Sequence, residues 1–154
     1  MTYLTKINKY NTWANDLLIH SLRSQEINDE SVLKLLSHIV HSESVWMMRL
    51  KGEDYSNKNF WKVLSLTECN RLSQENSKRY SDYLKEKSDN DLERLITYKN
   101  SEGIEYSNSI EDILFHIFYH SGYHRGQIAK EVRNLGKEPV YTDYIEYIRN
   151  FLQK

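Results

Sequence analysis

Apolar residues recur every three or four positions along most of the chain, which is the spacing that gathers them on one face of a helix. The pattern predicts four long helices and a short one near the C-terminus. Their approximate ranges are 2–24, 30–51, 67–84, 110–135 and 142–152. Side chains suited to capping stand before three of the long helices: Asn28 or Asp29, Ser65 or Thr67, and Ser109. A glycine, Gly136, is expected to end the fourth.

Two segments break the helical spacing. Residues 52–66 are irregular, and their aromatic pair, Phe60 and Trp61, is expected to cover one end of the core. Apolar and polar residues alternate on either side of Ser101-Glu102-Gly103, which predicts a small β-hairpin. One proline and five glycines favour long helices over a strand-rich fold. The sequence therefore predicts an all-α bundle, one domain over residues 1–154, with a hairpin before the helix at 110–135 and a short C-terminal helix.

Composition then excludes several classes of function. A chain of 154 residues suits one domain with a sizeable core. Charged residues make up 28% and the formal net charge is −1, so nothing marks a nucleic-acid binder. The single cysteine, Cys69, allows no intramolecular disulfide, which fits a reducing cytosol. Because the N-terminus has no signal-peptide pattern and no apolar run approaches membrane length, a cytoplasmic protein without a membrane partner is expected.

The helix at 110–135 carries the clearest candidate chemistry, in the stretch HIFYHSGYHRGQI. Its histidines, His116, His120 and His124, stand four residues apart, so neighbouring ones stack on one helical face and can grip one metal ion. All three cannot share the ion, because eight residues rise about 12 Å whereas a metal–imidazole bond is about 2 Å. Helical phase turns His120 and His124 inward and leaves His116 at the rim. Two core histidines with hydrogen-bond partners are the alternative, but burying two unpaired imidazoles is costly, so the pair favours a metal.

Other polar residues also fall on predicted core faces. Glu43 sits within the apolar stripe of the second helix, so it is either paired or part of a site. Asn11 shares the inward face of the first helix, as an interhelical hydrogen-bonding group or as a lining residue of a cleft. His38 and His41 lie off the apolar stripe, and phase alone places His38 at the boundary with the surface.

The motifs together resemble the DinB-like family of metal-dependent enzymes over nearly the whole chain. The resemblance rests on YNTWAN at 10–15, on His38-Ile39 followed by Glu43 and Trp46, on the hairpin, and on HIFYHSGYHRGQI. Leu135-Gly136, Pro139 and Asp143 complete the pattern. The resemblance implies a four-helix bundle with an unusual connection and a metal at one end. It also implies that His38 ligates the metal together with His120 and His124, and that His116 does not.

The resemblance further implies a chemistry. Three neutral imidazoles leave an open position on a divalent ion, with zinc as the default and nickel, manganese or iron as alternatives. Relatives of the family include transferases that use small thiols such as bacillithiol, so the expected partners are a low-molecular-weight thiol and a small-molecule electrophile. Glu43, Tyr123 and Arg125 are the candidates for catalytic roles, although Arg125 belongs to a motif that also suits a structural role.

Two alternatives to the transferase stay open. One is a metal-dependent hydrolase that uses bound water, and the other is a non-catalytic metal-binding protein of a stress response, in which the metal only holds the bundle together. A fourth protein ligand would favour the structural role, and an open position would favour either enzyme. A homodimer is also expected, because 12 tyrosines and three tryptophans exceed what one small core requires.

Overall fold

The computed structural model describes residues 3–151, which form six helices and one two-stranded hairpin. The long helices are α1 (Tyr3–Ser24), α2 (Glu30–Lys51), α3 (Leu66–Lys85) and α5 (Ile110–Asn134). The smaller elements are α4 (Asp89–Leu92), β1 (Leu95–Lys99), β2 (Glu105–Ser109) and α6 (Tyr144–Phe151). The predicted helical bundle, hairpin and C-terminal helix are confirmed. Thr2 and Leu152, the predicted outer limits, lie outside the described residues.

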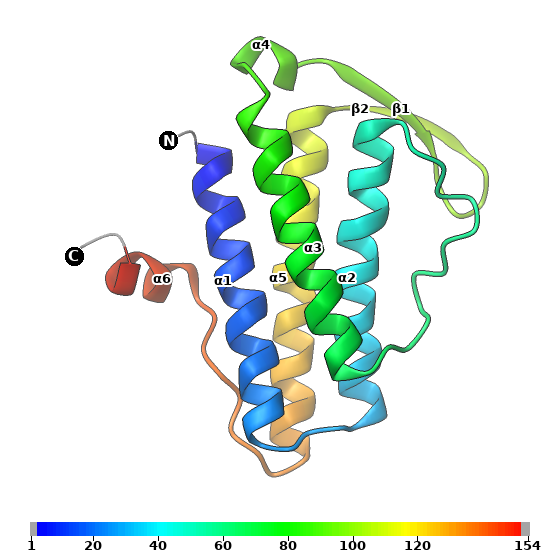
Figure 1. The fold of residues 1–154 in the computed structure, drawn as a ribbon. Coiled ribbons are helices and arrows are strands. Elements are labelled where there is room, and N and C mark those ends of the chain that lie inside the picture. The colour runs from blue at the N-terminus through cyan, green and yellow to red at the C-terminus, as the bar shows by residue number, and fades with distance from the viewer. Residues whose placement is uncertain (1–2, 152–154) are drawn as a thin grey trace.

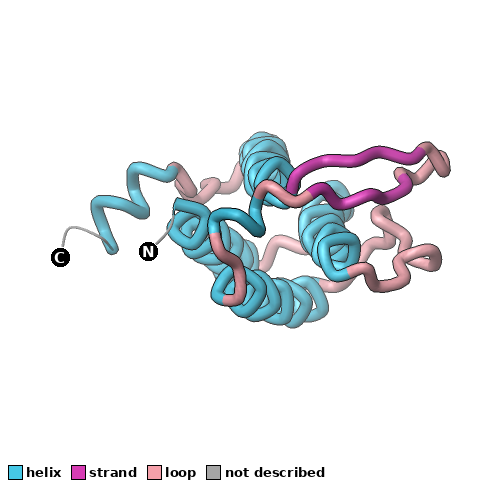
Figure 2. The backbone as a smooth tube through the Cα atoms, turned by 90° about the horizontal axis from the view of Figure 1, so that it is seen from above, coloured by secondary structure: helices cyan, strands magenta, loops and turns pink. Residues whose placement is uncertain are grey.

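The four long helices form a bundle in which α1 and α2 each pack against both α3 and α5 (Figures 1 and 2). Helices α2 and α3 run in the same direction, so the chain must return along the outside of the bundle between them (Figure 1). Residues 52–65 make that return. This long crossover is the unusual connection, and it brings a loop across the outer side of α2.

The helix ends follow the capping pattern of the sequence. The Asp29 side chain accepts hydrogen bonds from the first backbone amides of α2, and the Ser109 hydroxyl accepts one from the α5 backbone. Ser65, rather than Thr67, caps α3 and forms a capping box with Glu68. Gly136 ends α5 with a φ of +70°, the left-handed conformation that glycine adopts without strain.

The buried face of α1 lies about one residue away from the predicted one. The apolar spacing of α1 predicts Tyr3, Ile7 and Tyr10 on the core side, but Tyr3 is 58% exposed, and Leu4 is buried instead. The Tyr10 ring packs on the side of α1 that α6 covers, 5.2 Å from the Tyr144 ring. Helix α1 therefore has two apolar stripes, one toward the bundle and one toward α6. The spacing alone could not tell them apart.

The core is divided by a polar layer at mid-height. One apolar cluster includes Leu22, Leu36 and Ile128, and a second includes Leu4, Met47 and Ile113. The predicted stripe of α2 is buried in these two clusters, as expected. The buried polar side chains between them include Asn11, Asn15, Glu43, Ser121 and Arg125. Helices α1, α2 and α5 each contribute polar side chains to this layer, at the positions where a polar residue interrupts their apolar stripe.

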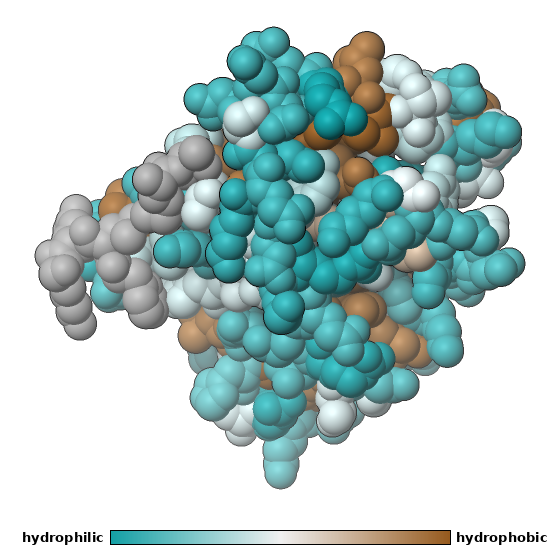
Figure 3. Space-filling model, turned by 45° about the horizontal axis from the view of Figure 1, so that its top comes forward, coloured by the Kyte–Doolittle hydropathy of each residue, from teal (hydrophilic) through white to brown (hydrophobic). Residues whose placement is uncertain are grey.

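The hairpin pairs β1 and β2 in antiparallel register, with Tyr98 opposite Tyr106. It lies at the end of the bundle where α5 begins (Figure 1). The charged run KEKSDNDLER at residues 85–94, before the hairpin, contains the single turn α4. The face in Figure 3 is mostly hydrophilic, with apolar residues in separate patches. Of the helices in residues 3–151, none is long and apolar enough to cross a membrane.

Candidate metal centre

Three histidines from two helices meet on the side of the bundle between α2 and α5. The Nε2 atom of His120 lies 3.2 Å from Nε2 of His38 and 3.1 Å from Nε2 of His124. One ring nitrogen from each residue falls within 4.8 Å of the other two. The structure thus brings together the three residues that the sequence pattern and the resemblance pointed to.

The outer nitrogens of two rings are held by oxygen acceptors. His38 Nδ1 lies 3.2 Å from the Phe60 carbonyl oxygen, and His124 Nδ1 lies 2.6 Å from Oε1 of Gln127. A neutral imidazole has one N–H, and an oxygen acceptor at Nδ1 fixes that N–H there. The lone pairs of both Nε2 atoms then point into the cluster, as metal ligation requires.

His38 reaches this position because the crossover loop buries it. Phase placed His38 at the surface boundary of α2, but residues 52–65 fold over that boundary. The Trp61 ring stacks on the imidazole with centroids 3.9 Å apart and planes 12° from parallel, and His38 is only 8% exposed. Phe60 and Trp61 therefore cover the histidine cluster and not an end of the core, which corrects the prediction from the sequence.

Burial favours the neutral form of His120 and His38. Desolvation, together with the proximity of His124 and His38, lowers the pKa of His120 to about 3. Desolvation also lowers the pKa of His38, partly offset by its hydrogen bond to the Phe60 carbonyl. Neutral imidazoles are the form that binds metal, so the environment favours the ligating state near pH 7.

The cluster has the dimensions of a three-nitrogen metal site. Ligands about 2.0–2.1 Å from one tetrahedral zinc ion lie about 3.3 Å apart, close to the two short separations seen here. Among residues 3–151, no fourth histidine, cysteine, aspartate or glutamate joins the group. His38 and His120 lie near the middle of their helices, so the site is on the side of the bundle. The resemblance had implied a site at one end of the bundle, and this expectation is corrected.

A groove of about 570 Å³ opens beside the cluster, and we call it the histidine groove. Its lining includes His38, His120, Trp46, Arg49, Lys58 and Trp61. The lining contains two cationic side chains and no carboxylate. The groove is therefore suited to a ligand that carries negative charge and reaches the histidines from one side.

Arg49 is held rigidly within this groove. Its guanidinium carbon lies 4.3 Å from the centre of the Trp46 ring and 4.9 Å from the centres of the Tyr55 and Tyr98 rings. Its Nη2 atom donates a hydrogen bond to the Lys99 carbonyl at 3.1 Å, while Nε has no partner among the described residues. Arg49 could not be assigned to the site from the sequence, because Tyr55 and Tyr98, which help to enclose it, come from the loop and the hairpin.

Glu43 lies in the polar layer and not in the histidine groove. Its Oε1 atom accepts hydrogen bonds from the amides of Asn11 and Asn15 at 2.8 and 2.9 Å, and from the Ser121 hydroxyl at 2.8 Å. Arg125 Nη1 donates to the amide oxygens of the same two asparagines at 2.7 and 2.8 Å. The asparagines bridge a buried carboxylate and a buried guanidinium across three helices. Asn11 is thus an interhelical hydrogen-bonding group, and Asn15, one turn further on, was missed.

The other two candidates for catalytic roles lie away from the histidine groove. Tyr123 is 66% exposed, and its ring packs at its edge against that of His124, with centroids 5.2 Å apart. Tyr123 and Arg125 both line a different cavity, between α1, α5 and α6. His116 packs against Trp46 at the rim and stands outside the three-residue cluster, as expected.

Fold and site together define a helical bundle with a three-histidine cluster compatible with a divalent metal ion. The model of the DinB family matches residues 3–151, and the chain belongs to this family. It is 26% identical to Protein DinB of Bacillus subtilis over 160 residues, covering 93% of this chain and 92% of that protein. It is 27% identical to the uncharacterized protein YizA of Bacillus subtilis over 135 residues, covering 87% and 84% of the two chains. A crystal structure of a DinB-like protein from Bacillus cereus shares the fold, with a TM-score of 0.61, 21% identity, and coverage of 89% of this chain and 92% of that chain.

Proposed function

We propose that the protein is a divalent-metal-dependent S-transferase that joins a low-molecular-weight thiol of the bacillithiol type to a small electrophile. The main support for this proposal is the three-histidine cluster, one side of which faces the histidine groove with its two cationic side chains. The absence of a fourth protein ligand within residues 3–151 supports an enzyme over an ion that only holds the bundle together.

His38, His120 and His124 would hold the ion, which we propose to be zinc. The ion would supply Lewis acidity, which lowers the pKa of a thiol that reaches the open position. Phe60 and Gln127 hold two of the imidazoles in the ligating tautomer. Trp61 stacks over His38 and excludes water from that side of the cluster.

The histidine groove supports an anionic thiol as the co-substrate. Small thiols such as glutathione and bacillithiol carry carboxylates. Arg49 and Lys58 line the groove and would bind these groups, with the sulfur toward the histidines. In the transfer, the sulfur electron pair forms a bond to an electrophilic carbon as the bond to the leaving group breaks. The thiol proton passes to the leaving group or to water, so the step needs no oxidant or reductant.

The test combines metal analysis with turnover. Purified protein is analysed for bound metal and then assayed with a panel of electrophiles and with bacillithiol, mycothiol, glutathione or no thiol. We expect turnover that requires both metal and thiol and is lost in His120→Ala. Turnover without any thiol would favour the hydrolase, and a metal-loaded protein inactive with every pair would favour the non-catalytic alternative. The homodimer remains a prediction, which light scattering at micromolar concentration tests.

A further inference from the structure

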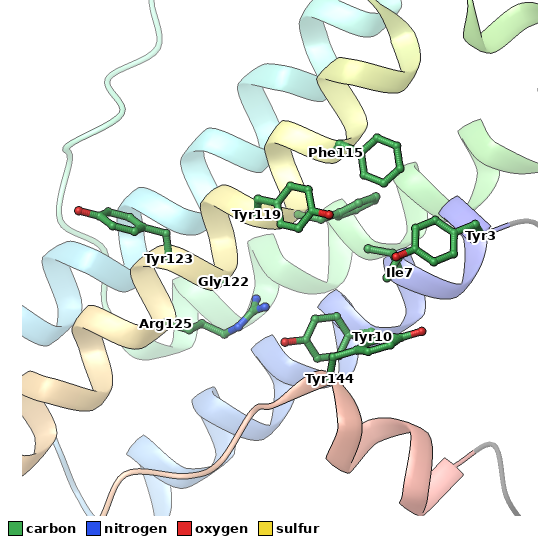
Figure 4. A pocket seen from close by; sticks show the side chains of 10 residues that line it. Tyr3, Ile7, Tyr10, Phe115, Tyr119, Gly122, Tyr123, Arg125 and Tyr144 are labelled. Carbon is green, nitrogen blue, oxygen red and sulfur yellow. The ribbon is translucent and has the colours of Figure 1, made fainter.

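A second cavity, of about 490 Å³, lies between α1, α5 and α6, away from the histidine groove (Figure 4). Its walls are mostly aromatic and include Tyr3, Tyr10, Phe115, Tyr119 and Tyr144. We call it the aromatic cavity. Its volume is within the range of small-molecule sites, which typically combine apolar walls with a few polar groups.

Arg125 is the charged group of this cavity. The residue is only 3% exposed, and its guanidinium extends from α5 toward Tyr10 (Figure 4). Its Nη1 atom is fixed by the amide oxygens of Asn11 and Asn15, as described above. Its Nε and Nη2 atoms have no hydrogen-bond partner within 3.5 Å among the described residues, although the Tyr10 side chain lies nearby and interacts with the guanidinium. A buried donor without a partner costs free energy, so an acceptor is expected there.

The two unpartnered atoms form one edge of the guanidinium. Nε and Nη2 carry N–H bonds that point the same way, and this edge matches the two oxygens of a carboxylate. The asparagines hold Nη1 and so fix the direction of the free edge. Glu43 is electrostatically favourable for Arg125 but does not contact it, since its carboxylate accepts hydrogen bonds from the asparagines and not from the guanidinium.

Gly122 leaves room beside this edge. A Cβ atom placed on Gly122 would lie 3.7 Å from Nη2 of Arg125, so a larger side chain there would cover the guanidinium. One turn along α5, Gly126 has no heavy atom within 4 Å of such a Cβ and does not line the aromatic cavity. The two glycines therefore provide a matched pair for substitution.

We propose that the aromatic cavity binds an aromatic monocarboxylate, with the carboxylate on the Nε–Nη2 edge of Arg125 and the ring among the tyrosines. Aromatic walls contact a flat apolar body over both faces, and the arginine edge selects the acid over a neutral analogue. The site is independent of the histidine cluster and of the transferase proposed for it.

The test measures binding of 2-naphthoate by calorimetry, with 2-naphthylmethanol as the neutral analogue. We expect saturable binding of the acid at least about tenfold tighter than the alcohol, which corresponds to about 1.4 kcal/mol. Binding should be unchanged after chelation of metal and in His120→Ala, which excludes the histidine cluster as the site of the carboxylate. Equal affinities for acid and alcohol, or loss of binding in His120→Ala, would overturn the proposal.

Substitutions locate the site. Gly122→Leu should weaken 2-naphthoate binding at least about tenfold, whereas Gly126→Leu should leave it unchanged. Arg125→Lys keeps the charge but lacks the two-donor edge, so it should remove the preference for the acid. Because Arg125 also supports the core, the glycine pair decides the matter if Arg125→Lys does not fold. Undiminished binding of 2-naphthoate in Gly122→Leu would show that no such ligand site exists. The same conclusion would follow if the unmodified protein did not bind 2-naphthoate and self-associated through this face instead.

Discussion

The Nε2 atoms of His38 and His120 lie 3.2 Å apart although 82 positions separate the two residues in the chain. This approach depends on the antiparallel packing of α2 and α5 and on the crossover loop that buries His38. A separation of this size between two imidazole nitrogens fits two ligands of one ion. The histidine cluster is therefore a property of the tertiary structure, to which the HxxxH spacing on α5 contributes two of the three residues.

The first prediction concerns metal content. His38→Ala, His120→Ala and His124→Ala should each abolish tight binding, because two remaining imidazoles hold a divalent ion weakly. His116→Ala and His41→Ala should retain it, because neither residue belongs to the cluster. Metal is measured by elemental analysis of the five purified variants. Full occupancy in His120→Ala would show that the site is not the one described.

The α5 pair was predictable from the sequence because both residues lie on one helix, whose phase is fixed by its own apolar residues. His38 was not predictable from phase, because its burial comes from Phe60 and Trp61 in a loop without periodicity. The resemblance to the family was what pointed to His38. Asn15 and Arg49 were not predicted for a similar reason. Asn15 bonds to Glu43 and Arg125 on other helices, and Arg49 is enclosed by rings from the loop and the hairpin.

Helical phase was least reliable where a helix packs on two sides. The Tyr10 side chain fits the apolar spacing of α1, but its hydroxyl donates to the Thr142 carbonyl at 2.7 Å, in the segment before α6. Helix α1 packs against the main bundle with one apolar stripe and against α6 with another. The spacing of apolar residues does not show which stripe faces which partner. The error in the buried face of α1 does not affect the predicted four-helix architecture, because α2 and α5 bury the faces that were predicted for them.

A second prediction tests the support of the metal ligands. Gln127→Ala removes the acceptor from His124 Nδ1, and loss of such a partner typically lowers metal affinity about 10–100-fold. Gln127→Glu keeps an acceptor oxygen and should retain most of the affinity. Competition with a chromophoric chelator measures both variants. Equal affinities for Gln127→Ala and the unmodified protein would mean that Gln127 does not orient the ring.

A third prediction concerns the polar layer. Glu43→Ala removes the acceptor shared by Asn11, Asn15 and Ser121 and leaves Arg125 buried without a nearby negative charge. Leaving a buried charge uncompensated costs about 3–5 kcal/mol of folding free energy. Glu75→Ala is the control, because Glu75 pairs with Arg71 on the exposed face of α3 and such a pair contributes at most about 1 kcal/mol. Chemical denaturation compares the two. A small loss in Glu43→Ala with normal metal content would show that the layer is not held by this carboxylate.

The last prediction concerns pH. The pKa of His120 is lowered to about 3 by burial, from an unfolded value near 6.5. A histidine with a depressed pKa in the folded state contributes stability that is fully present above the unfolded value and is lost as pH falls toward the folded value. The apo protein should therefore lose melting temperature gradually below about pH 6.5.

Metal binding adds to this dependence, because protons compete with the ion for all three imidazoles. The holo protein should lose metal and melting temperature together below about pH 6, more steeply than the apo protein. Melting curves with and without chelator, from pH 8 to about 5 so as to bracket the imidazole pKa, measure the difference. A constant offset between the two series over this range would rule out competition between protons and metal at the histidines. A difference that narrows with acid, in step with the metal released, is the result that three histidine ligands require.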